Sequence, residues 1–273
     1  KWLETYPDSS LREQMEFYVE PAEQTDAVKS KLNEITPTSL NPEELTLMDP
    51  ACGSGHILVE AYEIFKAIYL EQGYQIGEIP ELILTKNLYG LDICPRAAQL
   101  ATFSLLMKGC EDDRRLLFKN VDLNVVALQR SFEINFESIE KDLDFSSKPY
   151  HPEYIKYLNN LFKDATSIGS LIKLPIDLTL KLQELNPILE IKSQDILFSD
   201  LVNKLAILSK QSHLLINQYD TVVTNPPYMG NGAMCSLVKQ FAKKTYPDSK
   251  KDLFACFIEK SYSMAKPSGY VSL

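Results

Sequence analysis

The sequence has little of what builds disulfide frameworks or metal centres. Its 273 residues include five cysteines, with no Cys-x-x-Cys pair, and three histidines that lie far apart along the chain. This usage is typical of reduced thiols in a cytosolic protein and argues against a zinc site. We therefore expect no metal and a cytoplasmic location.

Long apolar runs and a signal peptide are also missing. No hydrophobic stretch approaches the ~20 residues that span a bilayer, and no basic segment precedes an apolar one in the secretory pattern. Membrane contact is therefore not expected. The chain starts without Met and stops inside an apolar run, residues 270–273, which suggests a piece of a longer protein.

The chain lacks the positive charge that most DNA-binding domains carry. Its net charge is −9, whereas non-specific DNA affinity depends on neutralising phosphates. The exception is residues 239–252, where five lysines and two aspartates leave a local charge of +3. This cluster is either a solvated helix face and turn or a loop that contacts phosphates beside an active site.

What the sequence does contain is the strand–helix alternation of a parallel α/β sheet. The first two strands are expected at 45–49 and 87–93, followed by helices over 57–71 and 95–108. A third strand is expected in residues 188–191 and 194–198, a fourth in the run that ends at Asn225, and a fifth at 269–273.

These patterns divide the chain into four segments. Residues 1–44 form an N-terminal helical segment, and residues 45–110 form the first half of the sheet domain. Residues 111–187 break the alternation and are expected to form a mainly helical insertion. Residues 188–273 form the second half, in which the sheet ends at its fifth strand.

A glycine-rich turn, Asp49-Pro50-Ala51-Cys52-Gly53-Ser54-Gly55, follows the first predicted strand. Glycines at the end of a parallel strand permit positive φ and let a ligand approach the backbone. The turn lacks the Gly-Lys-Ser/Thr ending of a P-loop, so a nucleoside triphosphate is not expected. Cys52 is interpreted as a small packing residue rather than a nucleophile. An ordinary strand-to-helix turn would have a similar sequence.

Two aspartates follow later predicted strands. Asp92 and Ile93 end the second strand, and an acid there can accept hydrogen bonds from both hydroxyls of a ribose. Asp92 could equally cap the next helix. Asp195 could accept a hydrogen bond from the amino group of an adenine while Ile196 packs on the adenine ring. The alternative is that Asp195 is a turn or cap aspartate.

The most specific string is Asn225-Pro226-Pro227-Tyr228, at the end of a predicted strand. Consecutive prolines make the turn stiff. The Asn225 side-chain oxygen and the Pro226 carbonyl can both accept hydrogen bonds from one amino group. Its lone pair is then free to attack a methyl group, and Tyr228 can stack on the attached base. The alternative is a Pro-Pro loop with a buried tyrosine.

Together these strings resemble the signature motifs of DNA methyltransferases that make N6-methyladenine. The glycine turn and the Asn-Pro-Pro-Tyr turn resemble the two main motifs, and Asp252-Leu253-Phe254 and residues 266–270 resemble the next two. More narrowly, residues 83–92, 246–250 and 252–254 are similar to the PglX adenine methyltransferases of bacteriophage-exclusion (BREX) systems, with fused restriction-modification enzymes close behind. The family's N-terminal Thr-Pro motif is not visible.

The resemblance implies a Rossmann-like methyltransferase sheet, truncated after the fifth strand, that uses S-adenosylmethionine. It also implies a phage-defence or restriction-modification enzyme that methylates adenine in double-stranded DNA, mainly held by regions outside this chain, with defence-system proteins as possible partners. The expected catalytic residues are Asn225, Pro226, Pro227 and Tyr228. The expected cofactor-binding residues are Asp49, Pro50, Ala51, Gly53, Gly55, Asp92, Ile93, Asp195 and Ile196.

Two alternatives stay open. One is a methyltransferase of RNA bases or of a protein glutamine amide, because those planar amines pose the same chemical problem. The other is an inactive cofactor-binding or scaffolding module. Because the Thr-Pro motif and the later strands are missing, this chain alone is expected to transfer methyl groups weakly or not at all.

Overall fold

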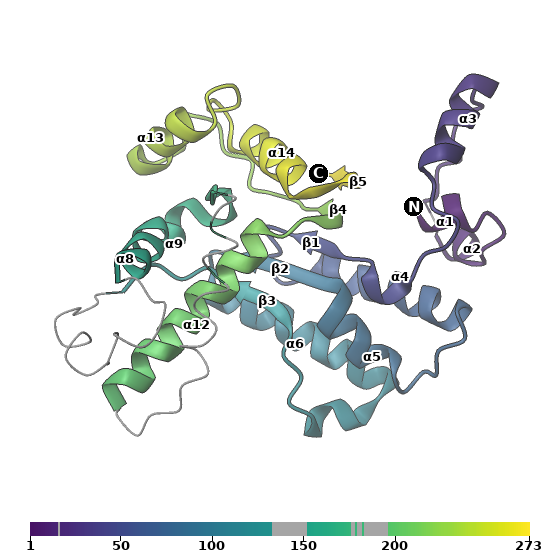
Figure 1. Ribbon diagram of the computed structural model, residues 1–273, viewed down its shortest axis with the longest axis horizontal. Helices are drawn as coiled ribbons and strands as arrows, with labels where there is room; N and C mark the ends of the chain where they lie inside the picture. The colour runs from purple at the N-terminus through teal and green to yellow at the C-terminus, as the bar shows by residue number, and fades with distance from the viewer. Residues whose placement is uncertain (16, 133–151, 176–177, 179–181, 183–195) are drawn as a thin grey trace.

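The structure is a computed structural model that describes residues 1–15, 17–132, 152–175, 178, 182 and 196–273. At its centre is a five-stranded parallel sheet with helices on both faces (Figure 1). This arrangement confirms the expected Rossmann-like α/β class. The strands are β1 (Leu47–Asp49), β2 (Leu88–Asp92), β3 (Asn124–Ala127), β4 (Tyr219–Val223) and β5 (Ala265–Ser272).

The strand order is β3-β2-β1-β4-β5. Met48 of β1 lies opposite Tyr89 of β2 on one side and Val222 of β4 on the other. The direction of strand addition therefore reverses between β1 and β4. In open α/β sheets, ligands bind outside the carboxyl ends of the strands at such a reversal.

Two long helices, α4 (His56–Glu71) and α6 (Pro95–Asp112), cover one face of the sheet. In α4 the buried side chains recur every three or four residues, as an amphipathic helix requires. The two helices approach closely because Gly55 precedes α4, and a Cβ there would lie 2.8 Å from Ala101 Cβ of α6. The buried residues of α4 are Leu58, Ala61, Tyr62, Phe65, Ile68 and Tyr69.

The opposite face is covered by α12 (Ile196–Ile216), α8 (Pro152–Leu161) and the end of α14 (Leu253–Met264). Figure 1 shows α12 passing across this face in front of the strands. A further cluster joins α13 (Ser236–Thr245) to α14 above the carboxyl edge of the sheet. Its buried members are Leu171, Met234, Val238, Ala242, Tyr246, Leu253, Cys256 and Phe257.

The third strand is not where the sequence pattern placed it. β3 covers Asn124–Ala127, inside the range expected to be a mainly helical insertion, and it is too short to give a clear alternation. Ile196 was assigned to a strand over 194–198, but it begins the helix α12. That assignment is wrong because buried Leu201, Leu205 and Leu208 continue a helical spacing from this point. The strand expected at 188–191 lies outside the described residues.

The N-terminal segment is helical only in short pieces: α1 (Trp2–Thr5), α2 (Leu11–Gln14), α3 (Asp26–Ile35) and a 3-10 turn at Pro42–Glu44. α3 buries no side chain and extends away from the sheet (Figure 1). The remaining short elements are α5 (Ile79–Leu82), a π-helical turn (Ile83–Asn87), 3-10 turns at Arg114–Phe118 and Gly169–Leu171, and α9 (Ala165–Ile168).

Candidate active site

The glycine turn is fastened to the end of β2 by backbone hydrogen bonds. The Cys52 amide donates to the Leu91 carbonyl, and the Gly53 amide donates to Asp92 Oδ2, both at 2.9 Å. Gly53 and Gly55 have φ of +52° and +88°, as the sequence predicted for this turn. A Cβ on Gly53 would meet no atom within 4 Å. The turn therefore leaves open space above its backbone.

Asp49 lies at the base of this turn and is only 1% exposed. Its Oδ1 accepts a hydrogen bond from the Ala51 amide at 3.0 Å, and no described residue forms an ion pair with it. Burial raises the pKa of the Asp49 carboxyl to about 6; the Thr224 side chain and the Ala51 amide oppose this shift, and the charge of Asp92 adds to it. A buried acid whose pKa is raised is a candidate functional group.

Asp92 joins the two turns that follow β1 and β2. Its Oδ2 accepts from the Gly53 amide and its Oδ1 accepts from the Cys94 amide at 2.7 Å. The N-cap of α6 is Cys94, so Asp92 is not the cap residue. Each carboxylate oxygen can accept two hydrogen bonds. One acceptor position therefore remains on each oxygen for a ligand.

The Asn-Pro-Pro-Tyr turn leaves the carboxyl end of β4, the strand next to β1. Asn225 and Pro227 are exposed, whereas Pro226 is buried beneath the turn. Tyr228 is 78% exposed and stacks on Phe254, with ring centroids 5.1 Å apart and planes 13° apart. The alternative of a buried tyrosine is therefore wrong.

The start of α14 supports this turn. The Leu253 amide donates to the Met229 carbonyl at 2.9 Å, and Gly230 pairs with Asp252 in an antiparallel bridge. Asp252 caps α14 by accepting from the Phe254 amide. The Asp-Leu-Phe string therefore holds the ring on which Tyr228 stacks.

One cleft of about 340 Å³ brings these strand ends together. It contains residues of the glycine turn, the end of β2 and the Asn-Pro-Pro-Tyr turn, so the structure joins three of the motifs that the sequence separated. Asp195 lies outside the described residues, and Ile196 begins α12. The lining residues are Pro50, Ala51, Asp92, Ile93, Asn225, Pro227, Leu253, Phe257 and residues 167–170.

Sequence reasoning missed the segment 167–170, which forms one wall of the cleft. Gly169 has φ +66° and ψ −148°, a conformation that glycine alone adopts readily. A Cβ on Gly169 would lie 2.7 Å from Ile93 Cγ2. The only signal in the sequence was the glycine itself, inside a range expected to be an insertion.

Other chemistries find no support in this part of the chain. Burial raises the pKa of the Cys52 thiol well above its usual range, so the residue is an inert packing group. The described residues contain no group of three or more His, Cys, Asp or Glu side chains placed to hold a metal ion. Among the helices of the described ranges, none has the length and apolar content needed to span a membrane.

Comparison with known families agrees with this geometry. Residues 86–273 match the model of the Eco57I restriction-modification methylase family, and this range includes β2 to β5 and the Asn-Pro-Pro-Tyr turn. The chain belongs to this methylase family. Residues 23–138, with the glycine turn, also match the model of the MmeI DNA-methyltransferase domain.

Two curated relatives extend the match over the N-terminal segment. The chain is 42% identical, over 99% of its length, to the adenine-specific methyltransferase BrxX of Escherichia coli O9:H4 (strain HS). It is 35% identical, over 85% of its length, to the adenine-specific methyltransferase PglX of Lacticaseibacillus casei (strain Zhang). The chain spans only 24% and 19% of these relatives. The resemblance to PglX-type adenine methyltransferases is confirmed.

Proposed function

We propose that the protein containing this chain methylates the exocyclic amino group of adenine in double-stranded DNA, as part of a phage-defence or restriction-modification system. The observation that carries this proposal is the joining of Asp92 and Asn225 in one cleft. Asp92 supplies free acceptors for a nucleoside cofactor, and Asn225 supplies an acceptor for an amine. The names of the two curated relatives support the same activity.

The residues present fit S-adenosylmethionine. Asp92 has acceptor positions left for ribose hydroxyls, and Gly53 leaves its backbone open. Bound here, the cofactor would supply an electrophilic methyl group on a sulfonium. The chain's own contribution is to hold the donor at the carboxyl ends of β1 and β2, beside the turn that follows β4.

The turn Asn225-Pro226-Pro227-Tyr228, defined here as the catalytic turn, would orient the target amine. The amino group of adenine is a poor nucleophile because its lone pair is delocalised into the ring. Hydrogen bonds to the Asn225 oxygen and the Pro226 carbonyl would draw its protons and expose that lone pair. Because the paired and stacked base cannot reach the cleft, it must flip out of the duplex. The exposed Tyr228 ring can then stack on it.

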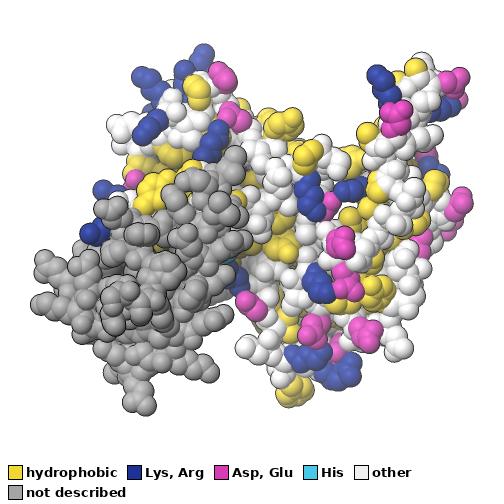
Figure 2. Space-filling model, in the orientation of Figure 1, with side chains coloured by type: hydrophobic (Ala, Val, Ile, Leu, Met, Phe, Trp, Pro, Cys, Tyr) yellow, Lys and Arg dark blue, Asp and Glu magenta, His cyan; other side chains and the backbone are white. Residues whose placement is uncertain are grey.

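The lysines of α13 and the loop after it favour contact with DNA phosphates. Nine lysines elsewhere in the described residues form ion pairs with carboxylates. Five lysines in this region form none in the described part of the chain, and Figure 2 shows dark blue side chains gathered at this corner of the molecule. These five, defined here as the α13 lysines, are Lys239, Lys243, Lys244, Lys250 and Lys251.

The activity is tested by sequencing DNA for N6-methyladenine from cells with and without the full-length protein. Asp92→Ala should weaken binding of S-adenosylhomocysteine by about 1.5–3 kcal/mol, measured by calorimetry, because it removes hydrogen bonds to a charged group. An unmethylated genome in cells that express the full-length protein would contradict the proposal. So would an assay with a labelled methyl donor in which the label reaches RNA or protein but not DNA.

The DNA contact is tested by the salt dependence of binding. Replacing Lys243, Lys244 and Lys251 with Gln in the full-length protein should reduce the slope of log K against log salt by about 0.9 for each phosphate that is no longer neutralised. The matched control replaces Lys86, Lys119 and Lys210, which are paired with Glu43, Glu81 and Asp122. An equal change in both proteins would show that the α13 lysines are only a solvated helix face.

A further inference from the structure

The wall of the cleft that sequence reasoning missed is fixed to the glycine turn by a buried hydroxyl. Ser170 is 2% exposed, and its Oγ donates to the Pro50 carbonyl at 2.5 Å. On the other side, Gly169 presses against Ile93 so closely that no larger residue fits. Residues 169–172, defined here as the strap, therefore contact the ends of both β1 and β2.

The same strap is tied to α14, which carries Phe254, and to the end of α13. The Tyr246 hydroxyl, at the end of α13, donates to the Leu171 carbonyl at 2.6 Å. Lys260 of α14 is 3% exposed and donates to the Ile172 carbonyl at 3.0 Å. Three successive strap residues are thus held by three different elements of the fold.

Packing of the strap does not by itself require these hydrogen bonds. Leu171 already packs in the apolar cluster between α13 and α14, so the strap is anchored without the hydroxyls. The buried hydrogen bonds instead set where the Pro50 carbonyl and the strap backbone lie relative to the cleft. Buried polar ties of this kind specify position more than they add stability.

We propose that Ser170 is a positioning residue for the glycine turn, and that Tyr246 positions the strap on the side of α13 and α14. The inference rests on the proposed function, because its ligand is the nucleoside cofactor of that site. Gly169 and Ser170 of the strap line one side of the cleft. Tyr246 does not line the cleft. An effect of Tyr246 on the cofactor therefore passes through the strap.

The test compares two strap variants with two matched controls in the full-length protein. Ser170→Ala and Tyr246→Phe each remove one buried hydroxyl that donates to a strap or turn carbonyl. Ser212→Ala and Tyr219→Phe remove buried hydroxyls that donate to Leu208 and Leu214 carbonyls, away from the cleft. Melting temperatures of the free proteins should fall to a similar extent in both sets.

Calorimetric binding of S-adenosylhomocysteine should separate the sets. We expect about three- to tenfold weaker binding for Ser170→Ala and for Tyr246→Phe, and less than a twofold change for the controls. The double variant should lose less than the product of the two single losses, because both act on one strap. In methyl-transfer assays of the two strap variants, KM for the cofactor should rise while kcat stays unchanged.

Two results would overturn the proposal. If the strap variants bind S-adenosylhomocysteine as tightly as their controls, Ser170 and Tyr246 serve only the stability of the fold while the proposed function stands. If the wild-type protein does not bind this molecule, the proposed function fails and the inference fails with it. Should Ser170→Ala not fold, Tyr246→Phe alone decides between these outcomes.

Discussion

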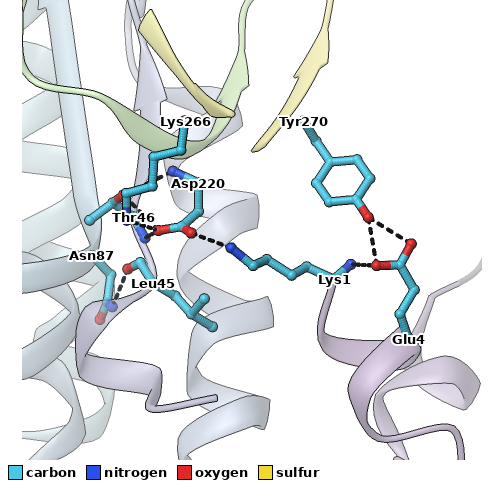
Figure 3. Close-up of polar contacts among 8 residues, drawn as sticks. All are labelled: Lys1, Glu4, Leu45, Thr46, Asn87, Asp220, Lys266 and Tyr270. Atoms are coloured by element: carbon cyan, nitrogen blue, oxygen red, sulfur yellow. Dashed lines mark hydrogen bonds and ion pairs between the residues drawn. The ribbon is translucent and has the colours of Figure 1, made fainter. Parts of the chain in front are cut away.

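The buried carboxylates at the two ends of the sheet have different partners. At the amino end of β4, Asp220 is 5% exposed and contacts Lys1 Nζ at 2.5 Å, Lys266 Nζ at 2.7 Å and the Thr46 amide and hydroxyl at 3.1 Å (Figure 3). At the carboxyl end of β1, Asp49 is still more buried and accepts from the Ala51 amide, with no cation from the described residues beside it.

The pKa values of the two acids follow this difference. Burial by itself raises the pKa of Asp220, but the ammonium groups of Lys1 and Lys266 outweigh burial and hold it below its usual value. Burial raises the pKa of Asp49 to about 6 without that compensation. The buried carboxylate of Asp220 is thus matched by cations, whereas that of Asp49, next to the cleft-lining Pro50, has no cation partner among the described residues.

The comparison predicts first that the carboxyl end carries the chemistry. Asn225→Ala should reduce the methylation rate by roughly 10²–10³-fold, the loss typical of one polar group that acts in the transition state. Affinity for S-adenosylhomocysteine should stay nearly unchanged. Both are measured on the full-length protein by single-turnover methyl transfer and calorimetry.

Asn231→Ala is the matched control for this variant, because Asn231 is exposed in the loop that follows the catalytic turn. It should methylate at close to the wild-type rate. If Asn225→Ala does so as well, the assignment of the catalytic turn is wrong.

At the amino end, the expected effect is on stability alone. Asp220→Asn should lower the free energy of unfolding by about 1.5–3 kcal/mol, because it removes the charge that accepts from two ammonium groups. Cofactor affinity of the folded protein should not change. Thermal unfolding of the full-length protein measures the first quantity and calorimetry the second.

The control for Asp220→Asn is Asp122→Asn, which breaks the pair with Lys210 on the surface, where the carboxylate is 85% exposed. It should change the free energy of unfolding by less than about 0.5 kcal/mol. A loss of cofactor affinity in Asp220→Asn would mean that the two ends of the sheet are not independent.

Asp49→Asn should raise the free energy of unfolding, whereas Asp220→Asn lowers it. The folded-state pKa of Asp49, about 6, lies above that of the unfolded chain. Its charged form therefore costs stability above pH 6, and this cost disappears as the pH falls toward 4. At pH 7.5 the variant should be more stable by about 1–2 kcal/mol and bind S-adenosylmethionine more weakly.

Melting curves between pH 4.5 and 8 test this sign. The difference between Asp49→Asn and the wild type should shrink as the pH falls through 6. A variant that is less stable than the wild type at pH 7.5 would show that Asp49 is matched by a group in the protein after all.

The smallest expected effect is that of the tyrosine hydroxyl in the catalytic turn. Tyr228→Phe keeps the ring that stacks on Phe254 and should change the methylation rate less than about threefold. Tyr228→Ala removes the stacking surface, worth about 1–3 kcal/mol per base. Measured rates of both variants distinguish the ring from the hydroxyl, and a large loss in Tyr228→Phe would assign chemistry to the hydroxyl.

Much of the fold and of the candidate site could be predicted from short strings of residues. The strands before Asp49, Asp92 and Asn225 lie where the sequence placed them, and the helix after Gly55 follows its apolar spacing. The third strand could not be predicted, because residues 124–127 are few and become a strand only by pairing with β2. The start of α12 was missed for a related reason, since a short apolar run fits a strand or a helix equally.

The sequence by itself determined the two turns of the site. The freedom of Gly53 and Gly55 to adopt the positive φ seen here and the stiffness of Pro226–Pro227 are properties of those residues in any fold. Only the tertiary structure decided which acids are matched and which are not, because Lys1 and Lys266 reach Asp220 from the two ends of the chain. It also decided the third wall of the cleft, since Ser170 meets Pro50 only when residues 120 positions apart are folded together.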